Sequence, residues 1–191
     1  MSPRTAEKFS EMRQSARSRI MDAAMEIFAE EGFHPASIGR IARKAGVSKG
    51  LMYNYFKSKE ELLRAIISSG VESLSLGFDP DRDGVLTKSE MVHFIRGSFS
   101  MVKEHPTYWK LYFLVVYQSP AIQLFEDELT GILKRYLRML ERYFGDLKLE
   151  NPYVEARLFM SMLDGVCINF LHSPEGFPME EIEEKMVKMY S

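Results

Sequence analysis

The chain has 191 residues, of which 46% are apolar and 27% are charged, and its formal net charge is −2. Such a composition supplies a sizeable core and argues against a disordered, collagen-like or repeat protein. Cys167 is the one cysteine, no apolar run reaches the ~18 residues of a membrane span, and the N-terminus lacks a signal-peptide pattern, so we expect a cytoplasmic protein with no membrane partner.

The charge is distributed unevenly along the chain. Residues 1–64 contain 12 Lys and Arg against 8 Asp and Glu, a net charge of +4, whereas residues 65–191 contain 13 against 19, a net charge of −6. A basic module joined to an acidic remainder fits a nucleic-acid contact that is confined to one end of the protein.

Helical periodicity dominates the sequence, and no strand-like alternation is found. Ser37, Ser48 and Asn151 are suited to cap helices, while Gly32 and Gly46 are suited to end them. The pattern predicts an all-α protein of about nine helices. Their approximate ranges are 7–31, 38–45, 49–55, 59–76, 88–104, from 106 onward, 121–144, 152–172 and 179–190.

Residues 35–59 contain six basic side chains and no acidic one. The same residues read as two short helices joined by a tight turn at 45–47, which is the frame of a helix-turn-helix. A local charge of +6 on this frame indicates double-stranded DNA as the partner. The alternative is a solvated basic face with tyrosines in the core. The six side chains are Arg40, Arg43, Lys44, Lys49, Lys57 and Lys59.

The second helix of such a motif lies in the major groove, with its first residues at the bases. Lys49 is predicted to reach a base edge or a phosphate, Gly50 to let the backbone approach DNA, and Leu51 to pack on a thymine methyl group. Tyrosine hydroxyls and helix N-termini favour phosphates. The full set of predicted DNA contacts is Ser37, Arg40, Lys49, Gly50, Leu51, Tyr53, Tyr55 and Lys59.

Residues 38–62 resemble the DNA-binding domain of TetR-family transcriptional regulators. The likeness covers about residues 15–64, and its most specific parts are AGVSKG at 45–50, YNYF at 53–56 and KSKEEL at 57–62. Leu51 departs from the family pattern, which more usually has a small or hydroxyl residue there. By resemblance, the contact positions are those of Ser37, Lys49, Gly50, Tyr53, Tyr55 and Lys59.

This resemblance implies a homodimer that binds a near-palindromic operator and that is released from it by a small-molecule effector. It further implies a DNA-binding domain at 1–57 and a helical effector-binding and dimerisation domain at 58–191. The apolar stripes of 121–144 and 152–172 are the predicted dimer surfaces. We expect a repressor, although the choice between repressor and activator rests on family habit.

The stretch 79–90 fits the 12-residue calcium loop of an EF-hand, and its flanks resemble a single EF-hand of the calmodulin type. The predicted metal ligands are Asp79, Asp81, Asp83, the carbonyl of Val85, and Glu90. No cofactor is required, but calcium is possible, which gives an alternative function as a calcium-responsive regulator or calcium-binding sensor. The competing interpretation is a capped turn, because Thr87 with Glu90 is also a capping box.

Residues 88–120 are rich in aromatic residues, which either line an apolar ligand pocket in the helical body or form ordinary core. An enzyme is not expected, because the four histidines are not set at metal or nucleophile spacing and no phosphate-binding loop is found. The predicted pocket residues are Phe94, Trp109, Tyr112, Phe113 and Phe159.

Overall fold

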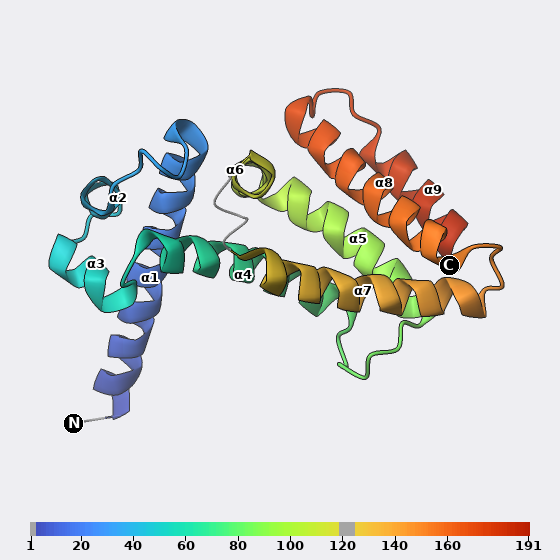
Figure 1. Ribbon diagram of the computed structural model, residues 1–191, viewed down its shortest axis with the longest axis horizontal. Coiled ribbons are helices and arrows are strands. Elements are labelled where there is room, and N and C mark those ends of the chain that lie inside the picture. Colours follow the sequence, from blue (N-terminus) through green and yellow to red (C-terminus); the bar gives the residue numbers. More distant parts are fainter. Residues whose placement is uncertain (1–2, 119–124) are drawn as a thin grey trace. The chain divides into compact units, whose positions relative to one another are not determined.

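The computed structural model describes residues 3–118 and 125–191, which form nine helices and no strand (Figure 1). The predicted all-α class is confirmed. Residues 121–124, with which the seventh predicted helix starts, lie outside the described residues. The helices are α1 Pro3–Glu31, α2 Ile38–Lys44, α3 Lys49–Tyr55, α4 Lys59–Phe78, α5 Lys88–Glu104, α6 Pro106–Gln118, α7 Glu126–Asp146, α8 Pro152–His172 and α9 Met179–Tyr190.

The chain divides into two compact units, one of residues 1–70 with 111–122 and the other of residues 71–110 with 123–191. The first unit thus takes in residues 58–70, which the sequence analysis assigned to the second domain. Leu62, Leu63 and Ile66 on this part of α4 are almost completely buried, because an apolar stripe of a helix gains stability by packing on its neighbours. The functional boundary at 57/58 stays a prediction.

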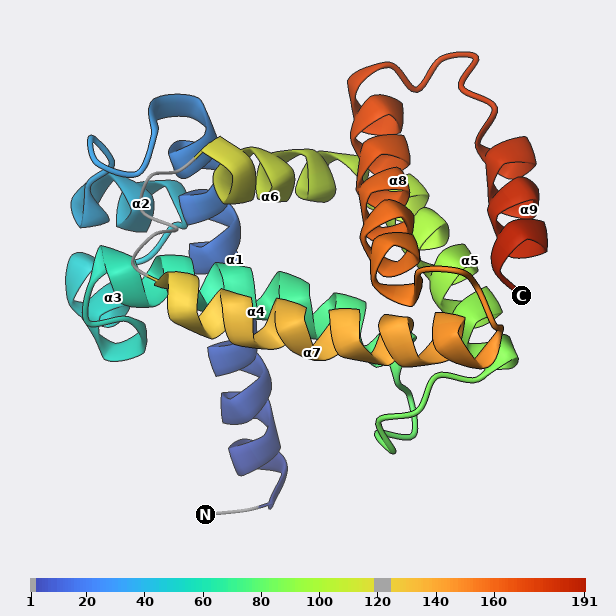
Figure 2. The ribbon, with the colours of Figure 1, turned by 45° about the vertical axis from the view of Figure 1, so that its right-hand side comes forward.

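The first unit packs α2 and α3 beside α1 (Figure 2). The hydroxyl oxygen of Ser37 accepts a hydrogen bond from the Arg40 backbone nitrogen, and that of Ser48 accepts one from the Leu51 backbone nitrogen. Both short helices therefore have an N-terminal cap. Gly46 lies between them at φ +66°, a left-handed conformation that favours glycine. These local features fix the turn of the helix-turn-helix.

In the second unit, α5, α8 and α9 lie side by side and α7 packs against α8 (Figure 1). Aromatic rings join these helices, with centroids 6.0 Å apart for Phe144 and Phe159 and 5.0 Å apart for Phe159 and Tyr190. The buried hydroxyl of Tyr143 donates a 2.7 Å hydrogen bond to the carbonyl of Tyr190. Aromatic side chains therefore contribute a large part of the core of this unit, beside aliphatic residues and methionines. In the described part of the chain, no helix combines the length and apolar character needed to cross a membrane.

Candidate functional site

The helix α3 presents one face to solvent and packs the other into the first unit. Met52 is completely buried, and Phe56, its C-cap, is 2% exposed. Lys49 and Gly50 are exposed, while Leu51 and Tyr53 keep 38% and 47% of their surface accessible. Exposed large apolar and aromatic side chains beside a lysine suit contact with bases and phosphates.

Three of the six basic side chains in residues 35–59 are held by partners within the unit. Nη2 of Arg40 lies 2.7 Å from Oε1 of Glu31, and Nζ of Lys44 lies 2.6 Å from Oε2 of Glu26. The hydrogen bond to Glu26 raises the pKa of the Lys44 ammonium. The Lys59 ammonium donates to the carbonyl oxygens of Phe33 and His34, at 2.8 and 2.9 Å. It therefore ties the start of α4 to the loop before α2.

The other three basic side chains, those of Arg43, Lys49 and Lys57, are exposed and form no ion pair with another described residue. Arg43 and Lys57 were not among the predicted DNA contacts, although both belong to the basic run that the sequence shows. Charges without an internal partner are available to an external anion. Arg43 and Lys57 are additional candidate phosphate contacts beside Lys49.

The remaining predicted DNA contacts are Ser37 and Tyr55. Ser37 is exposed, and its side-chain oxygen accepts the capping hydrogen bond of α2. Its hydroxyl group can still donate a hydrogen bond to a phosphate. Tyr55 is half-buried at the end of α3. Gly50 has no atom within 4 Å of the position that a Cβ would take. The fold of the unit itself leaves room for a side chain at this position.

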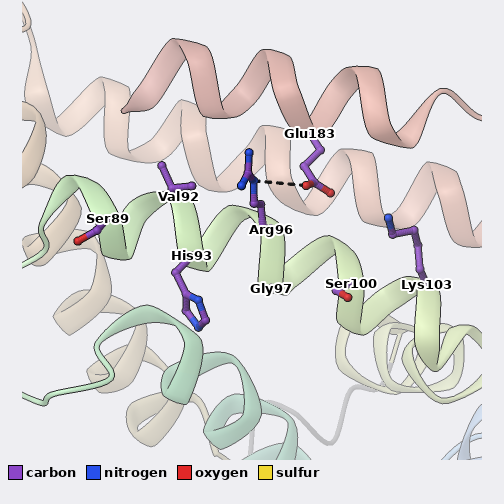
Figure 3. Close-up of a pocket in the computed structure, with 8 residues that line it drawn as sticks. All are labelled: Ser89, Val92, His93, Arg96, Gly97, Ser100, Lys103 and Glu183. Atoms are coloured by element: carbon purple, nitrogen blue, oxygen red, sulfur yellow. Dashed lines mark ion pairs between the residues drawn. The ribbon is translucent and has the colours of Figure 1, made fainter.

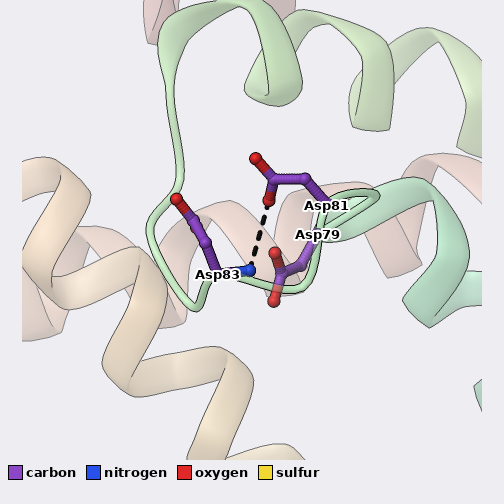
Figure 4. A group of neighbouring side chains, drawn as sticks. All are labelled: Asp79, Asp81 and Asp83. Carbon is purple, nitrogen blue, oxygen red and sulfur yellow. Dashed lines mark hydrogen bonds between the residues drawn. The ribbon is translucent and has the colours of Figure 1, made fainter.

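The predicted metal loop joins α4 to α5 in the second unit. Carboxylate oxygens of Asp79, Asp81 and Asp83 lie within 4.8 Å of one another, gathered in a single turn (Figure 4). Glu90 instead receives hydrogen bonds from Thr87, at 2.8 Å from its nitrogen and 2.6 Å from its hydroxyl, in a complete capping box. Three predicted ligands are thus together, and the fourth carboxylate serves the helix start.

Asp79 has a partner that the sequence did not indicate. Its carboxylate is buried, and Oδ2 lies 3.6 Å from Nη2 of Arg135 on α7. Its other oxygen, Oδ1, is buried without any hydrogen-bond partner. No local pattern could have paired these residues, because they are far apart in the sequence.

The predicted pocket residues are mostly core. Phe94 and Phe159 are buried with ring centroids 6.2 Å apart in the second unit. Trp109 and Tyr112 are also buried, while Phe113 is partly exposed and is followed by a stacked Tyr117. Neither of the two hollows described for the second unit is lined by any of the five predicted residues.

The first of these hollows lies along α5, has a volume of about 510 Å³, and carries charged groups (Figure 3). Arg96 and Glu183 both line it. Arg96 forms ion pairs with Glu183 and with Glu184, the next residue of α9. The second hollow, of about 360 Å³, is formed by α8, α9 and the segment between them and is almost entirely apolar. Its lining includes Gly165, Val166 and Met189.

The capped, basic helix-turn-helix of the first unit defines a module of DNA-binding type. Comparison with known proteins agrees, since residues 20–66 match the family model described as bacterial regulatory proteins, tetR family. The transcriptional regulator SrpR of Pseudomonas putida is 43% identical over 76 residues, which are 40% of this chain and 36% of SrpR. Residues 20–66 are therefore similar to the DNA-binding domain of tetR-family regulatory proteins.

Similarity beyond the module is weaker. The fatty acid metabolism regulator protein of Bacillus subtilis is 30% identical over 124 residues, which are 64% of this chain and 63% of that protein. The chain thus spans less than two thirds of the length of either relative. The structure of FadR from Bacillus subtilis in complex with stearoyl-CoA shares the fold, with a TM-score of 0.68 at 19% identity over 91% of this chain and 96% of FadR.

Proposed function

We propose that the chain is a TetR-family transcriptional regulator, a homodimeric repressor that binds a near-palindromic operator and leaves it when a small molecule binds. The observation that supports this most directly is the exposed face of α3. Lys49, Gly50, Leu51 and Tyr53 are turned to solvent on a helix that its caps and the buried Met52 hold in place. The geometry fits a helix that enters the major groove with its N-terminal residues foremost.

Each exposed group has a distinct proposed role. The Lys49 ammonium contacts a phosphate or a guanine edge, and Gly50 allows the backbone close to the DNA. Leu51 packs on a thymine methyl group, and Tyr53 donates its hydroxyl to a phosphate. Arg43 and Lys57 extend the phosphate contact. Lys59, whose ammonium has two carbonyl partners, contributes chiefly by positioning the start of α4, where backbone N–H groups face an anion.

The experiment that tests this proposal begins with selection of operators from random double-stranded DNA by the full chain. Fluorescence anisotropy then measures the affinity of the selected DNA for the wild type and for Tyr53→Phe and Lys49→Ala. We expect a near-palindromic consensus and a weaker affinity in both variants. Failure to enrich any sequence above the random pool would refute specific DNA recognition.

An apolar stripe on α8 supports the homodimer. Val154, Leu158 and Ile168 are exposed by 52%, 47% and 39%, and they follow each other at helical spacing with Ser161 and Gly165 between them. Small residues within an apolar stripe let a second helix approach closely. The apolar hollow formed with α9 borders the same face, since Gly165 lines it. We propose that a second copy of the chain covers this stripe.

The effector is proposed to be an apolar or amphipathic small molecule. The support is the similarity to a fatty acid metabolism regulator and to the fold of a protein solved with stearoyl-CoA. The predicted pocket side chains Phe94 and Phe159 belong to the aromatic core of the second unit. Long-chain acyl-CoA is therefore the first ligand to test, by its ability to release the repressor from the selected operator.

A calcium-responsive regulator is the second candidate function. The observation that favours it is the cluster of Asp79, Asp81 and Asp83 oxygens within 4.8 Å. α4 begins at Lys59, shortly after α3, and ends at Phe78, immediately before this cluster. The candidate is tested by measuring operator affinity in calcium and in chelator, and equal affinities would reject calcium control.

A further inference from the structure

The geometry points to a calcium site in the loop between α4 and α5, with Glu90 exchanging a helix-capping role for a metal-ligand role. This inference rests on the calcium-responsive candidate and deepens it by naming the ligands and the switch. The first support is the buried Oδ1 of Asp79, which has no hydrogen-bond partner. A buried, unsatisfied carboxylate oxygen is unusual, and an ion at that position satisfies it.

The second support is the pattern of hydrogen bonds that the carboxylate oxygens of Asp81 and Asp83 accept within the loop. Oδ1 of Asp81 accepts a hydrogen bond from the Asp83 nitrogen at 3.2 Å (Figure 4). Oδ1 of Asp83 accepts one from the Val85 nitrogen at 2.7 Å. These bonds hold the two carboxylates in the turn and leave one oxygen on each side chain for a ligand. Together with Asp79 they offer three carboxylates to one cation.

Glu90 is the group that changes partners. Its Oε2 accepts hydrogen bonds from the backbone nitrogen and from the hydroxyl of Thr87. In this arrangement the carboxylate is part of the capping box at the start of α5. Calcium takes six to eight oxygens and accepts both oxygens of a carboxylate, whereas magnesium demands a tighter octahedron and keeps more of its water. Adding Glu90 and the Val85 carbonyl to the three aspartates matches the larger, more flexible shell of calcium.

Arg135 opposes the cation. Its guanidinium lies 3.6 Å from Oδ2 of Asp79 and is 61% exposed, so it partly neutralises the deepest carboxylate while remaining free to move away. Arg82 and Lys88 add positive charge within the loop sequence, and both are exposed. Removal of the Arg135 charge should therefore strengthen calcium binding, because a positive neighbour competes for the same carboxylate.

The experiment uses the full chain, with calcium chloride or magnesium chloride as the probe, in thermal melts and in isothermal titration calorimetry. Three variants separate folding from binding. Asp81→Asn with Asp83→Asn preserves both Oδ1 acceptors but removes two charges. Glu90→Gln preserves the capping box, which accepts Gln as well as Glu, but removes a charged bidentate ligand. Arg135→Gln removes the competitor, and Asp146→Asn, an exposed change on α7, is the control.

We expect saturating calcium to raise the melting temperature of the wild type by about 5–10 °C. The double Asn variant should lose this shift, Glu90→Gln should bind at least about tenfold more weakly, and Arg135→Gln should bind more tightly. Asp146→Asn should match the wild type. The variants are compared with the wild type in chelator, so that any loss of folding is measured separately from the calcium shift.

Three results would overturn the site: no calcium shift in the wild type, a full shift in the double Asn variant, or an equal response to magnesium. A calcium shift that leaves operator affinity unchanged has a different meaning. It would support the metal site while rejecting calcium control of DNA binding. Loss of operator binding under all conditions would instead count against the proposed DNA-binding function. The calcium titration would still decide whether the metal site exists.

Discussion

Tyr112 on α6 occupies the space beside Gly70 on α4 so closely that Gly70 has no room for a side chain. A Cβ atom at Gly70 would overlap ring atoms of Tyr112 and lie 2.7 Å from its hydroxyl oxygen. The same hydroxyl donates a 3.2 Å hydrogen bond to the carbonyl oxygen of Ile67, one turn earlier on α4. The two helices are thus joined by a close contact and a hydrogen bond at one point.

Gly70→Ala should therefore destabilise the protein, although alanine is the better helix former. Forcing a methyl group into a packed position costs about 1–3 kcal/mol, which exceeds the gain in helix propensity of about 1 kcal/mol. Urea unfolding measures the loss. Gly97→Ala on α5 is the matched control, because nothing lies within 4 Å of its Cβ position, and it should be neutral or stabilising.

A second substitution identifies the cause. Tyr112→Leu removes the ring atoms that meet the new methyl group, so the penalty of Gly70→Ala should shrink in that background. Double-mutant cycles measure such coupling between residues in contact. Strictly additive free energies of unfolding would show that Tyr112 does not restrict position 70.

Lys49→Ala should weaken operator binding and reduce the salt dependence of the affinity. Each phosphate contact that is lost lowers the slope of log affinity against log salt by about 1. Anisotropy titrations at several salt concentrations give this slope. Lys110→Ala is the control, because Lys110 is an exposed lysine outside the basic run. Equal slopes for the two variants would remove Lys49 from the DNA contact.

Gly50→Ala should separate stability from DNA binding. The Cβ position at Gly50 has no neighbour within 4 Å, so alanine should stabilise α3 by up to about 1 kcal/mol. The added methyl group lies on the exposed face, where the DNA backbone is proposed to approach, and operator affinity should fall. A variant that gains stability and keeps full affinity would show that DNA does not approach this position.

Sequence patterns succeeded where the determinants are local. The caps at Ser37 and Ser48 and the capping box of Thr87 with Glu90 are formed as the spacing predicted. Each involves a side chain and a backbone group three residues away, a distance that the sequence displays directly. Among the described helices, α7 and α9 begin without a side-chain cap, so their apolar residues at helical spacing were the signal that predicted them.

Partners from distant parts of the chain were not visible in the sequence. Neither the pairing of Arg135 with Asp79 nor the binding of the Lys59 ammonium to two carbonyls could be read from spacing. The same limit applies to the ligand pocket, because aromatic content does not separate a cavity from core. The basic run located the DNA-binding module, but only tertiary contacts distinguish paired cations such as Arg40 from open ones such as Lys57.

Cys167 should be unreactive in the folded protein and should make stability depend on pH at the alkaline end. Cys167 is 4% exposed, and burial, with a smaller effect of Asp164, raises the pKa of its thiol from the ordinary 9.0 to about 12. A thiol reagent at pH 8 should react with the unfolded chain and far more slowly with the folded one. Rapid reaction of the folded protein would contradict this burial.

The sign of the pH effect follows from the raised pKa. The unfolded chain releases the Cys167 proton from about pH 9, while the folded protein holds it until about pH 12. The stabilising contribution is therefore complete below pH 9 and is lost as the pH rises toward 12. Unfolding curves at several alkaline pH values should show a shallower decline for Cys167→Ala than for the wild type.

Leu158→Glu should convert the proposed homodimer into a monomer. Leu158 lies at the middle of the exposed apolar stripe of α8, where a second copy would bury it, and an unpaired carboxylate in that position is strongly unfavourable. Because the side chain is exposed within one subunit, helical content should be preserved. Sedimentation equilibrium measures the mass. Operator binding should weaken, because only a dimer presents two α3 helices to the two half-sites of the DNA. Arg142→Glu, a charge reversal on the exposed surface of α7, should leave the mass unchanged, and a dimeric Leu158→Glu protein would exclude this stripe as the interface.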